Sequence, residues 1–281
     1  ISVKLAADME KGLREIGTLM GGLTDKEIKN MGKEMQSLAA FSGQAMDKLI
    51  KARYDIVSAG FADAAASALL LKTSADLAVG GVSDVSTAAD LLTTTLNAYN
   101  LEVEKSVEIS DKLFTIVRLG KTTINELGSS MGNVLALAGQ LNVNLDEVGA
   151  TLATLTAGGI NTAEAVTSIN ATMTQLLTPT ESLKKAIKDL RFENGLALVK
   201  SEGLAGSIKL IQREAERTGV PLTDMFSNVR AMKAILPLTG TAAATFAKNL
   251  EEMGKSAGAT SKAVSEMQKS FTLNMSVGLQ K

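Results

Sequence analysis

The stretch FAKNLEEMGKSAGATSKAVSEMQKSF, residues 246–271, has the most regular hydrophobic period in the chain. Its apolar positions are separated by alternating steps of four and three residues, and the polar Thr260 occupies one position of the same series. The apolar members of this heptad series are Phe246, Leu250, Met253, Ala257, Val264, Met267 and Phe271. Such spacing keeps one side of a helix toward a partner helix over several turns. We therefore predict that residues 241–281 form a long coiled-coil-like helix that continues downstream, and that the heptad series carries helix association.

The residues that flank the heptad series are nearly uncharged, so flanking ion pairs do not select a partner. Two arrangements stay open at this point. The helix pairs with identical chains, or it folds back onto its own domain as an ordinary amphipathic helix.

The composition excludes several function classes. The 281 residues include no cysteine, histidine or tryptophan, and aromatic residues make up 3%. Without histidine and cysteine, neither a Ser-His-Asp or Cys-His catalytic group nor an ordinary zinc site can be built. The 29 basic and 30 acidic residues nearly cancel, so the chain lacks the basic footprint of a nucleic-acid-binding protein. We expect no enzyme activity, no cofactor, no metal site and no sequence-specific nucleic-acid binding.

The remaining composition predicts an all-α fold with no sheet. Hydrophobic residues reach 45% and only three prolines occur, which favours helices. We expect an N-terminal helix in residues 1–22 that continues from an upstream chain, and an Ala/Gly-rich helical core in residues 23–180. A helical connector is expected in residues 181–240, followed by the heptad helix. Because the sequence begins with Ile1, we expect a fragment of a longer product.

Two capping boxes mark predicted helix starts, one formed by Thr24 and Glu27 and the other by Thr123 and Glu126. The three residues before Thr123 read Gly120-Lys121-Thr122, which resembles the end of a phosphate-binding loop. Because the first glycine of that motif is missing and the preceding residues are helical in pattern, we interpret this segment as a helix connection.

A short phrase recurs at three predicted helix ends, where an apolar and a polar residue are followed by alanine and a turn. We interpret these places as three degenerate helix-turn-helix units, although chance similarity among Ala-rich helices is the alternative. We expect the alanines to be buried. The helix-end turn residues are Ala59, Gly60, Ala98, Tyr99, Ala157 and Gly158.

Residues 127–180 contain only three charged residues, Asp146, Glu147 and Glu164. This stretch is either deeply buried or able to enter a membrane. Several glycine, asparagine, serine and glutamine residues interrupt it, so we favour burial in a helical core.

Phrases across residues 24–271 resemble the core region of phage tail tape measure proteins. In the first part the resemblance rests on the Ala59-Gly60 and Leu96-Asn97-Ala98-Tyr99 turns, residues 121–127 and residues 152–160. In the later part it rests on residues 226–231, 236–240 and 253–267, which look like that family's passage into its coiled-coil section. No single phrase is specific, so the resemblance depends on their sum.

The resemblance implies a structural protein of the virion that sets tail length, scaffolds assembly of the tail tube and leaves at genome ejection. It implies several copies of the chain, as a trimer or hexamer, in the tube lumen or at the tip, after assembly in the host cytoplasm. The implied partners are the tail tube protein, tail tip or baseplate proteins and, at ejection, the host membrane. A membrane-active helical protein that forms or lines a channel through the host envelope is the alternative function.

Overall fold

The computed structural model describes the backbone of residues 3–279 and the side chains of residues 6–269. Every regular element in this part of the chain is helical, which confirms the predicted all-α class. The first elements are α1 (Val3–Leu19), α2 (Asp25–Ser42), α3 (Met46–Ser58), α4 (Ala64–Gly80), α5 (Val85–Ala98), the 3-10 turn η1 (Val103–Lys105), α6 (Ser106–Leu119), α7 (Ile124–Ser130) and α8 (Gly132–Leu141). The later elements are α9 (Leu145–Ala157), α10 (Thr162–Leu177), α11 (Glu181–Asp189), α12 (Gly195–Thr218), α13 (Leu222–Met225), α14 (Val229–Thr239), α15 (Ala243–Met253) and α16 (Ala259–Leu279).

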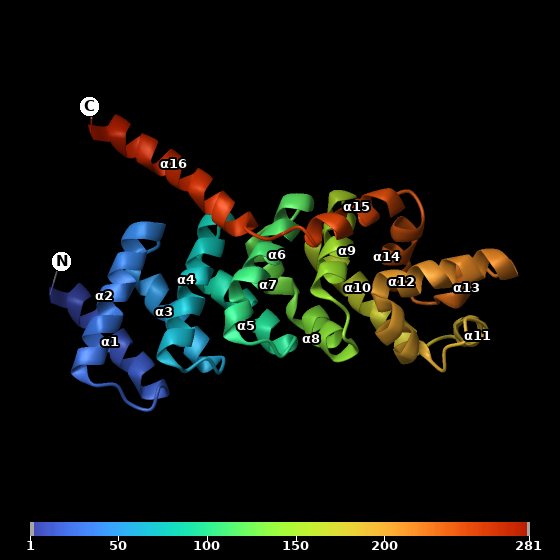
Figure 1. Cartoon of the computed structure of the whole chain (residues 1–281), viewed down its shortest axis with the longest axis horizontal. Coiled ribbons are helices and arrows are strands. Elements are labelled where there is room, and N and C mark those ends of the chain that lie inside the picture. Colours follow the sequence, from blue (N-terminus) through green and yellow to red (C-terminus); the bar gives the residue numbers. More distant parts are fainter. Residues whose placement is uncertain (1–2, 280–281) are drawn as a thin grey trace.

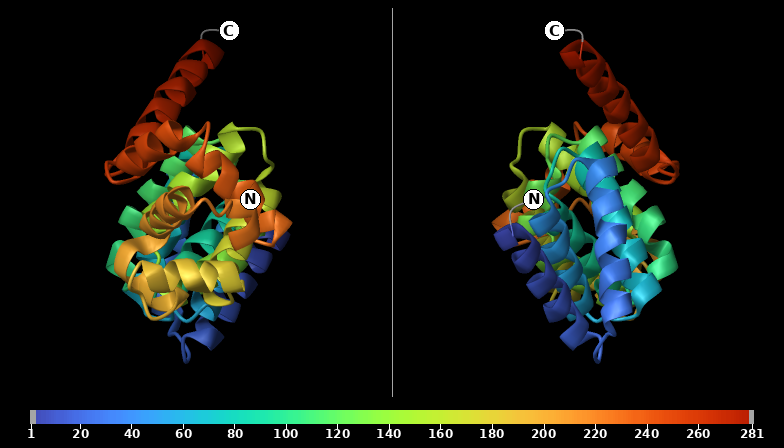
Figure 2. Two further views of the ribbon diagram at one scale, coloured as in Figure 1. Left: turned by 90° about the vertical axis from the view of Figure 1, so that its right-hand side faces the viewer. Right: turned by 90° about the vertical axis from the view of Figure 1, so that its left-hand side faces the viewer.

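The helices form an elongated stack along which the chain travels out and then back (Figure 1). Helices α1 to α12 follow one another from one end of the stack to the other. The chain then returns, with α14 packed against α10, α15 against α9, and α16 against α4 and α6. The last helices therefore contact earlier helices in reverse order, and the end-on views show α16 extending away from the body (Figure 2).

Local sequence signals explain where many helices begin. The Thr24 hydroxyl accepts the N–H of Glu27 while the Glu27 carboxylate accepts the N–H of Thr24, and Thr123 and Glu126 do the same. Both predicted capping boxes are therefore confirmed, and residues 120–122 connect two helices. Six other helices begin behind an Asp or Asn whose side chain accepts a backbone N–H of the first turn. These caps are Asp63, Asp84, Asn144, Asn161, Asn194 and Asn228.

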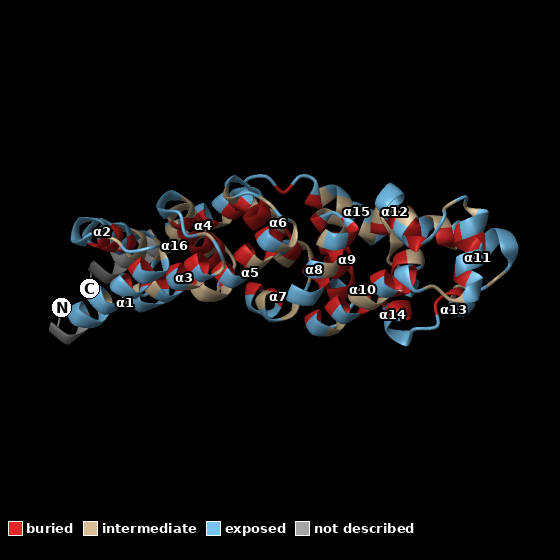
Figure 3. Cartoon of the chain, turned by 90° about the horizontal axis from the view of Figure 1, so that it is seen from below, coloured by how far each residue is buried: buried red, intermediate tan, exposed pale blue. Residues whose placement is uncertain are grey.

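The core is densest around α9, in which every residue from Val148 to Thr156 is buried (Figure 3). Its buried threonine hydroxyls donate to carbonyl oxygens one turn earlier, as Thr154 does to Ala150 at 2.7 Å. These bonds satisfy hydroxyls that would otherwise be costly inside a core. Burial thus accounts for the low charge of residues 127–180, as the sequence analysis favoured.

Across residues 3–279, no single helix combines the length and apolarity needed to cross a membrane. Helices α4 and α5 pass that test only as a pair, and the pair is bent by 119°. A single hydrophobic cluster connects residues of α1 with residues as far along the chain as α15. The division into four segments, with bounds at residues 22, 180 and 240, stays a prediction.

Two breaks interrupt the helices of the second half of the described chain. Helices α13 and α14 are separate, because Phe226 leaves the helical conformation and Asn228 caps a new start. Helix α12 begins at Gly195 and is interrupted only at Gly203. Pro237 lies in the last turn of α14.

Candidate functional site

The heptad series predicted for helix association is split between two helices. Helix α15 ends at Met253 and α16 starts at Ala259, with Gly258 in the left-handed conformation at φ 78°. The expectation of one continuous helix over residues 246–271 is therefore wrong. The physical reason lies in Asp111 of α6, whose carboxylate accepts the N–H of Gly258 at 2.7 Å and of Thr260 at 2.8 Å. It satisfies N–H groups that a new helix start leaves free.

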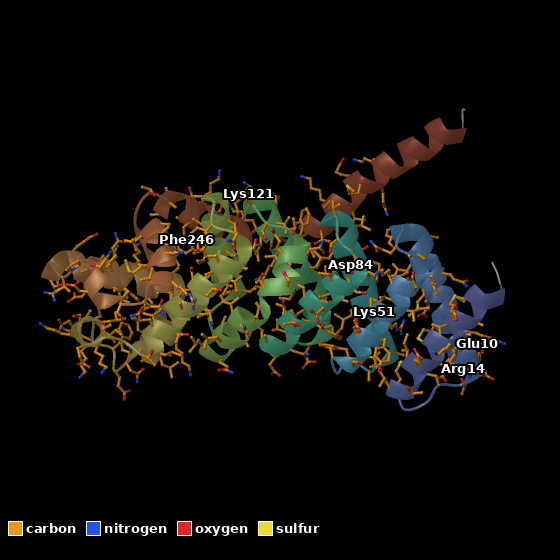
Figure 4. All side chains as sticks on the ribbon, turned by 180° about the vertical axis from the view of Figure 1, so that it is seen from behind. Glu10, Arg14, Lys51, Asp84, Lys121 and Phe246 are labelled. Atoms are coloured by element: carbon orange, nitrogen blue, oxygen red, sulfur yellow. The ribbon has the colours of Figure 1, made fainter. Side chains whose placement is uncertain are left out.

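The α15 part of the heptad series packs within the chain. Met253 is fully buried, and Phe246 and Leu250 are half-buried against the same core. Figure 4 shows Phe246 on the body of the molecule. A hydrogen bond of 2.9 Å from Asn249 to Thr154 and an ion pair of 3.1 Å between Arg118 and Glu252 fix α15 to its neighbours.

The α16 part of the series passes from packed to exposed within two turns. Thr260 and Val264 are 4% and 6% exposed, and the Thr260 hydroxyl lies 3.1 Å from that of Ser110 in α6. Helix α4 also lies close to α16, since a Cβ added to Gly80 would lie 3.1 Å from the Ala263 Cβ. Met267, the next member of the series, is 42% exposed. Its exposure marks where the series leaves the body.

One member of the series does not lie where the heptad pattern predicts. Ala257 is exposed and lies in the connection between α15 and α16, outside both helices. The side chain of Phe271 lies outside the described residues. The structure brings Thr260 and Val264 together with α4 and α6, and leaves Met267 available to a further partner.

The three predicted helix-end turns share one backbone geometry. In each, a residue with positive φ follows the helix, and the next residue donates its N–H to the carbonyl five positions earlier, the Schellman arrangement. The donors Phe61, Leu101 and Ile160 bond to Ile56, Leu96 and Leu155 at 3.3, 2.9 and 3.1 Å. The positive-φ residues are Gly60, Asn100 and Gly159.

This geometry shifts the first unit by one residue against the predicted register. Ala59 is equivalent to Tyr99 and Gly158, each of which is the C-cap of its helix. The expectation that the three alanines are buried is also wrong, since Ala59 and Ala98 are half-buried and Ala157 is exposed. The cause is that the apolar residue after the positive-φ position turns inward and covers the helix end.

Three further turns of the same kind were not predicted from the sequence. They have positive φ at Val82, Asn142 and Arg191, and the residue after each donates to the carbonyl five positions earlier. Glycine marks none of these positions. The available signal was the Asp or Asn helix cap that follows within three residues, at Asp84, Asn144 and Asn194.

Tyr99 is the polar member of the helix-end turns. Its hydroxyl is buried and has no hydrogen-bond partner among the described residues. Burial, together with the nearby Glu147 and Asp146 carboxylates, raises the pKa of the Tyr99 phenol well above its usual range. The folded protein therefore holds this proton more tightly than the unfolded chain does.

The raised pKa predicts a loss of stability at alkaline pH. Once the pH exceeds about 10, unfolding allows Tyr99 to ionise, so the free energy of unfolding falls. We expect urea unfolding at pH 8 to show Tyr99→Phe at least as stable as wild type, because the hydroxyl removed is buried and unpaired. At pH 10.5 the margin in favour of the variant should be larger. An equal effect of pH on both proteins would contradict the assignment.

Among the described residues, no group of three or more acidic, histidine or cysteine side chains is placed to hold a metal ion. The polar groups with the most distinctive geometry are the Asp111 carboxylate and the hydroxyls beside it. They hold the start of α16 against α6, so the site is built for helix packing.

The fold and this site define an all-helical protein, in which the last helix extends from an elongated stack of packed helices. The chain belongs to the family of phage-related minor tail proteins, whose family model matches residues 25–235. It is also similar to a probable tape measure protein of Clostridium phage phiCD119, with 27% identity over 288 residues. That similarity covers 99% of this chain but only 30% of the relative. No solved structure matches the chain.

These comparisons confirm the resemblance to phage tail tape measure proteins drawn from the sequence phrases. Membership of the family makes the chain a structural protein of the phage tail and a component of the virion.

Proposed function

We propose that this chain is a folded segment of a tape measure protein, which sets tail length and scaffolds assembly of the tail tube. The observation that carries the proposal is the similarity to the probable tape measure protein along 99% of the chain. A non-enzymatic role, release at genome ejection, and contacts with the tail tube and tip proteins belong to the same proposal.

The structure supports different roles for the packed body and for α16 within such a protein. Helices α1 to α15 share one packed core in which the chain turns back on itself, so they add less length per residue than one continuous helix does. Helix α16 extends from this body and rises about 1.5 Å per residue, so it is the part suited to act as a linear ruler. We propose that copies of the chain associate through the heptad series on α16.

Tail length provides the test. We expect that inserting 28 residues, as four heptads copied from the α16 pattern, directly after Met267 in the parent gene lengthens the tail by about 42 Å. The measurement is the mean tail length of purified particles in electron micrographs. Heptad units keep the hydrophobic series in register, which an insertion of another length would not do.

The matched control inserts 28 Gly/Ser residues between Gly21 and Gly22. Both glycines have positive φ and nothing lies within 4 Å of the Cβ that would be added to either, so the turn has room for extra chain. It adds the same number of residues without adding a helix, and normal tail length is expected. Unchanged length after the α16 insertion in intact tails would contradict the ruler proposal for this segment.

A further inference from the structure

We propose that the body of this protein holds the first turns of α16 in a latch, centred on Asp111, that prevents α16 from pairing with a second copy of the chain. The inference rests on the proposed self-association and adds its regulation. The latch consists of Asp111, Ser110 and Gly80 on the body and of Gly258, Thr260 and Val264 on the α16 side.

The latch and a partner helix require the same side of α16. Thr260 and Val264 are members of the heptad series, and α4 and α6 already bury them to 4% and 6% exposure. A partner helix must approach to within about 8–10 Å between axes to pack on that side. Because α4 and α6 occupy this space, docking and full pairing exclude one another.

The centre of the latch is polar. It can therefore be mutated without changing the apolar members of the heptad series. Asp111 is 3% exposed, and both of its oxygens accept backbone N–H groups at the start of α16. The buried hydroxyls of Ser110 and Thr260 add a contact of 3.1 Å. A carboxylate that bonds two backbone donors forms stronger hydrogen bonds than a neutral group would. Residues 254–258 between α15 and α16, with Gly258 at φ 78°, provide the hinge.

The heptad series on α16 fits a second copy of the same helix as its partner. The alternating four-and-three spacing continues from Val264 to Met267, where the series becomes exposed. The flanking positions Ser261 and Ala263 are uncharged, so identical helices side by side meet no like-charge repulsion there. The charged residues Lys269 and Glu266 pair with each other at 2.7 Å.

An engineered disulfide tests the docked state directly. The double variant Ser110→Cys with Thr260→Cys places two sulfurs where the hydroxyls lie 3.1 Å apart, and the chain has no other cysteine. Oxidation should cross-link the pair within one chain and lock α16 against the body. In sedimentation equilibrium, the oxidised protein should show a self-association Kd about tenfold or more above that of the same protein after reduction.

The opposite change should release α16. Asp111→Ala removes the acceptor of both N–H groups, and we expect its self-association Kd to fall about tenfold below that of wild type. Hydrogen exchange at the amides of Gly258 and Thr260 should accelerate at the same time. The matched control is Asp90→Ala, which removes an exposed aspartate from α5 and should leave both measurements unchanged. Far-UV circular dichroism checks that each variant is folded.

One more variant separates the latch from the association that it regulates. Met267 belongs to the series but is exposed, so Met267→Asp should abolish association without disturbing the docked turns. If Met267→Asp abolishes association but neither the disulfide nor Asp111→Ala changes its Kd, the latch is overturned and self-association stands. Failure of the cysteine pair to oxidise within one chain would also overturn the latch. If no variant associates, including Asp111→Ala, both proposals fail.

Discussion

Replacing Gly139 with alanine should lower the free energy of unfolding by about 3 kcal/mol, one of the largest effects expected of any single methyl group in this protein. Gly139 lies in α8, directly against the C-terminal end of α5. A Cβ at this position would lie 1.9 Å from the carbonyl oxygen of Ala98 and 2.9 Å from its carbonyl carbon. Because both atoms belong to the backbone, no side-chain rotation relieves the clash, and α8 must move away from α5.

The measurement is urea unfolding followed by circular dichroism. Alanine is favoured over glycine inside a helix by about 1 kcal/mol, so the clash must exceed that gain for destabilisation to appear. Gly132→Ala is the matched control, because Gly132 begins the same helix and nothing lies within 4 Å of its added Cβ. We expect that control to leave stability unchanged or to raise it by up to about 1 kcal/mol. Equal behaviour of the two variants would contradict the close approach of α8 to α5.

Sequence-local features of the fold were predictable. The two capping boxes bond as their residue types require, and the all-α class followed from helix-favouring composition with three prolines. The helix-end turns at Gly60, Asn100 and Gly159 were also located to within a residue. In the capping boxes and the helix-end turns, the interacting groups lie within six residues of one another. A short stretch of sequence therefore shows both partners.

Features that depend on distant residues were not predictable. The heptad series predicted one helix over residues 246–271, but Asp111, almost 150 positions earlier, caps a new helix start at Thr260. The spacing of apolar residues contains no information about a carboxylate supplied by α6. Likewise, in the sequence Gly139 is only one of the residues that interrupt an apolar stretch. The structure shows why glycine is needed there, since a Cβ would clash with the Ala98 carbonyl. The members of the heptad series lie on two surfaces, the core at Met253 and an exposed helix face at Met267. Helix association through this series stays a prediction.

Replacing Gly203 with alanine should cost about 3–4 kcal/mol, for two separate reasons. Gly203 interrupts α12 at φ 69° and ψ −176°, a backbone conformation that is essentially restricted to glycine. An added Cβ would also lie 2.4 Å and 2.6 Å from the two carboxylate oxygens of Glu147. Those oxygens accept the N–H groups of Ala205 and Leu204 at 3.1 and 3.2 Å, so displacing them leaves the second half of α12 without its cap.

A double-mutant cycle separates the backbone strain from the loss of the cap. We expect Glu147→Ala alone to cost about 1–2 kcal/mol, as the loss of a helix cap does. If Gly203→Ala acts partly by displacing the carboxylate, the double variant should be more stable than the sum of the two single effects predicts, by about 1 kcal/mol or more. Strict additivity would mean that backbone strain carries the whole effect of Gly203→Ala. A cost below 1 kcal/mol for Gly203→Ala itself would contradict the break in α12, because a continuous helix gains stability from alanine.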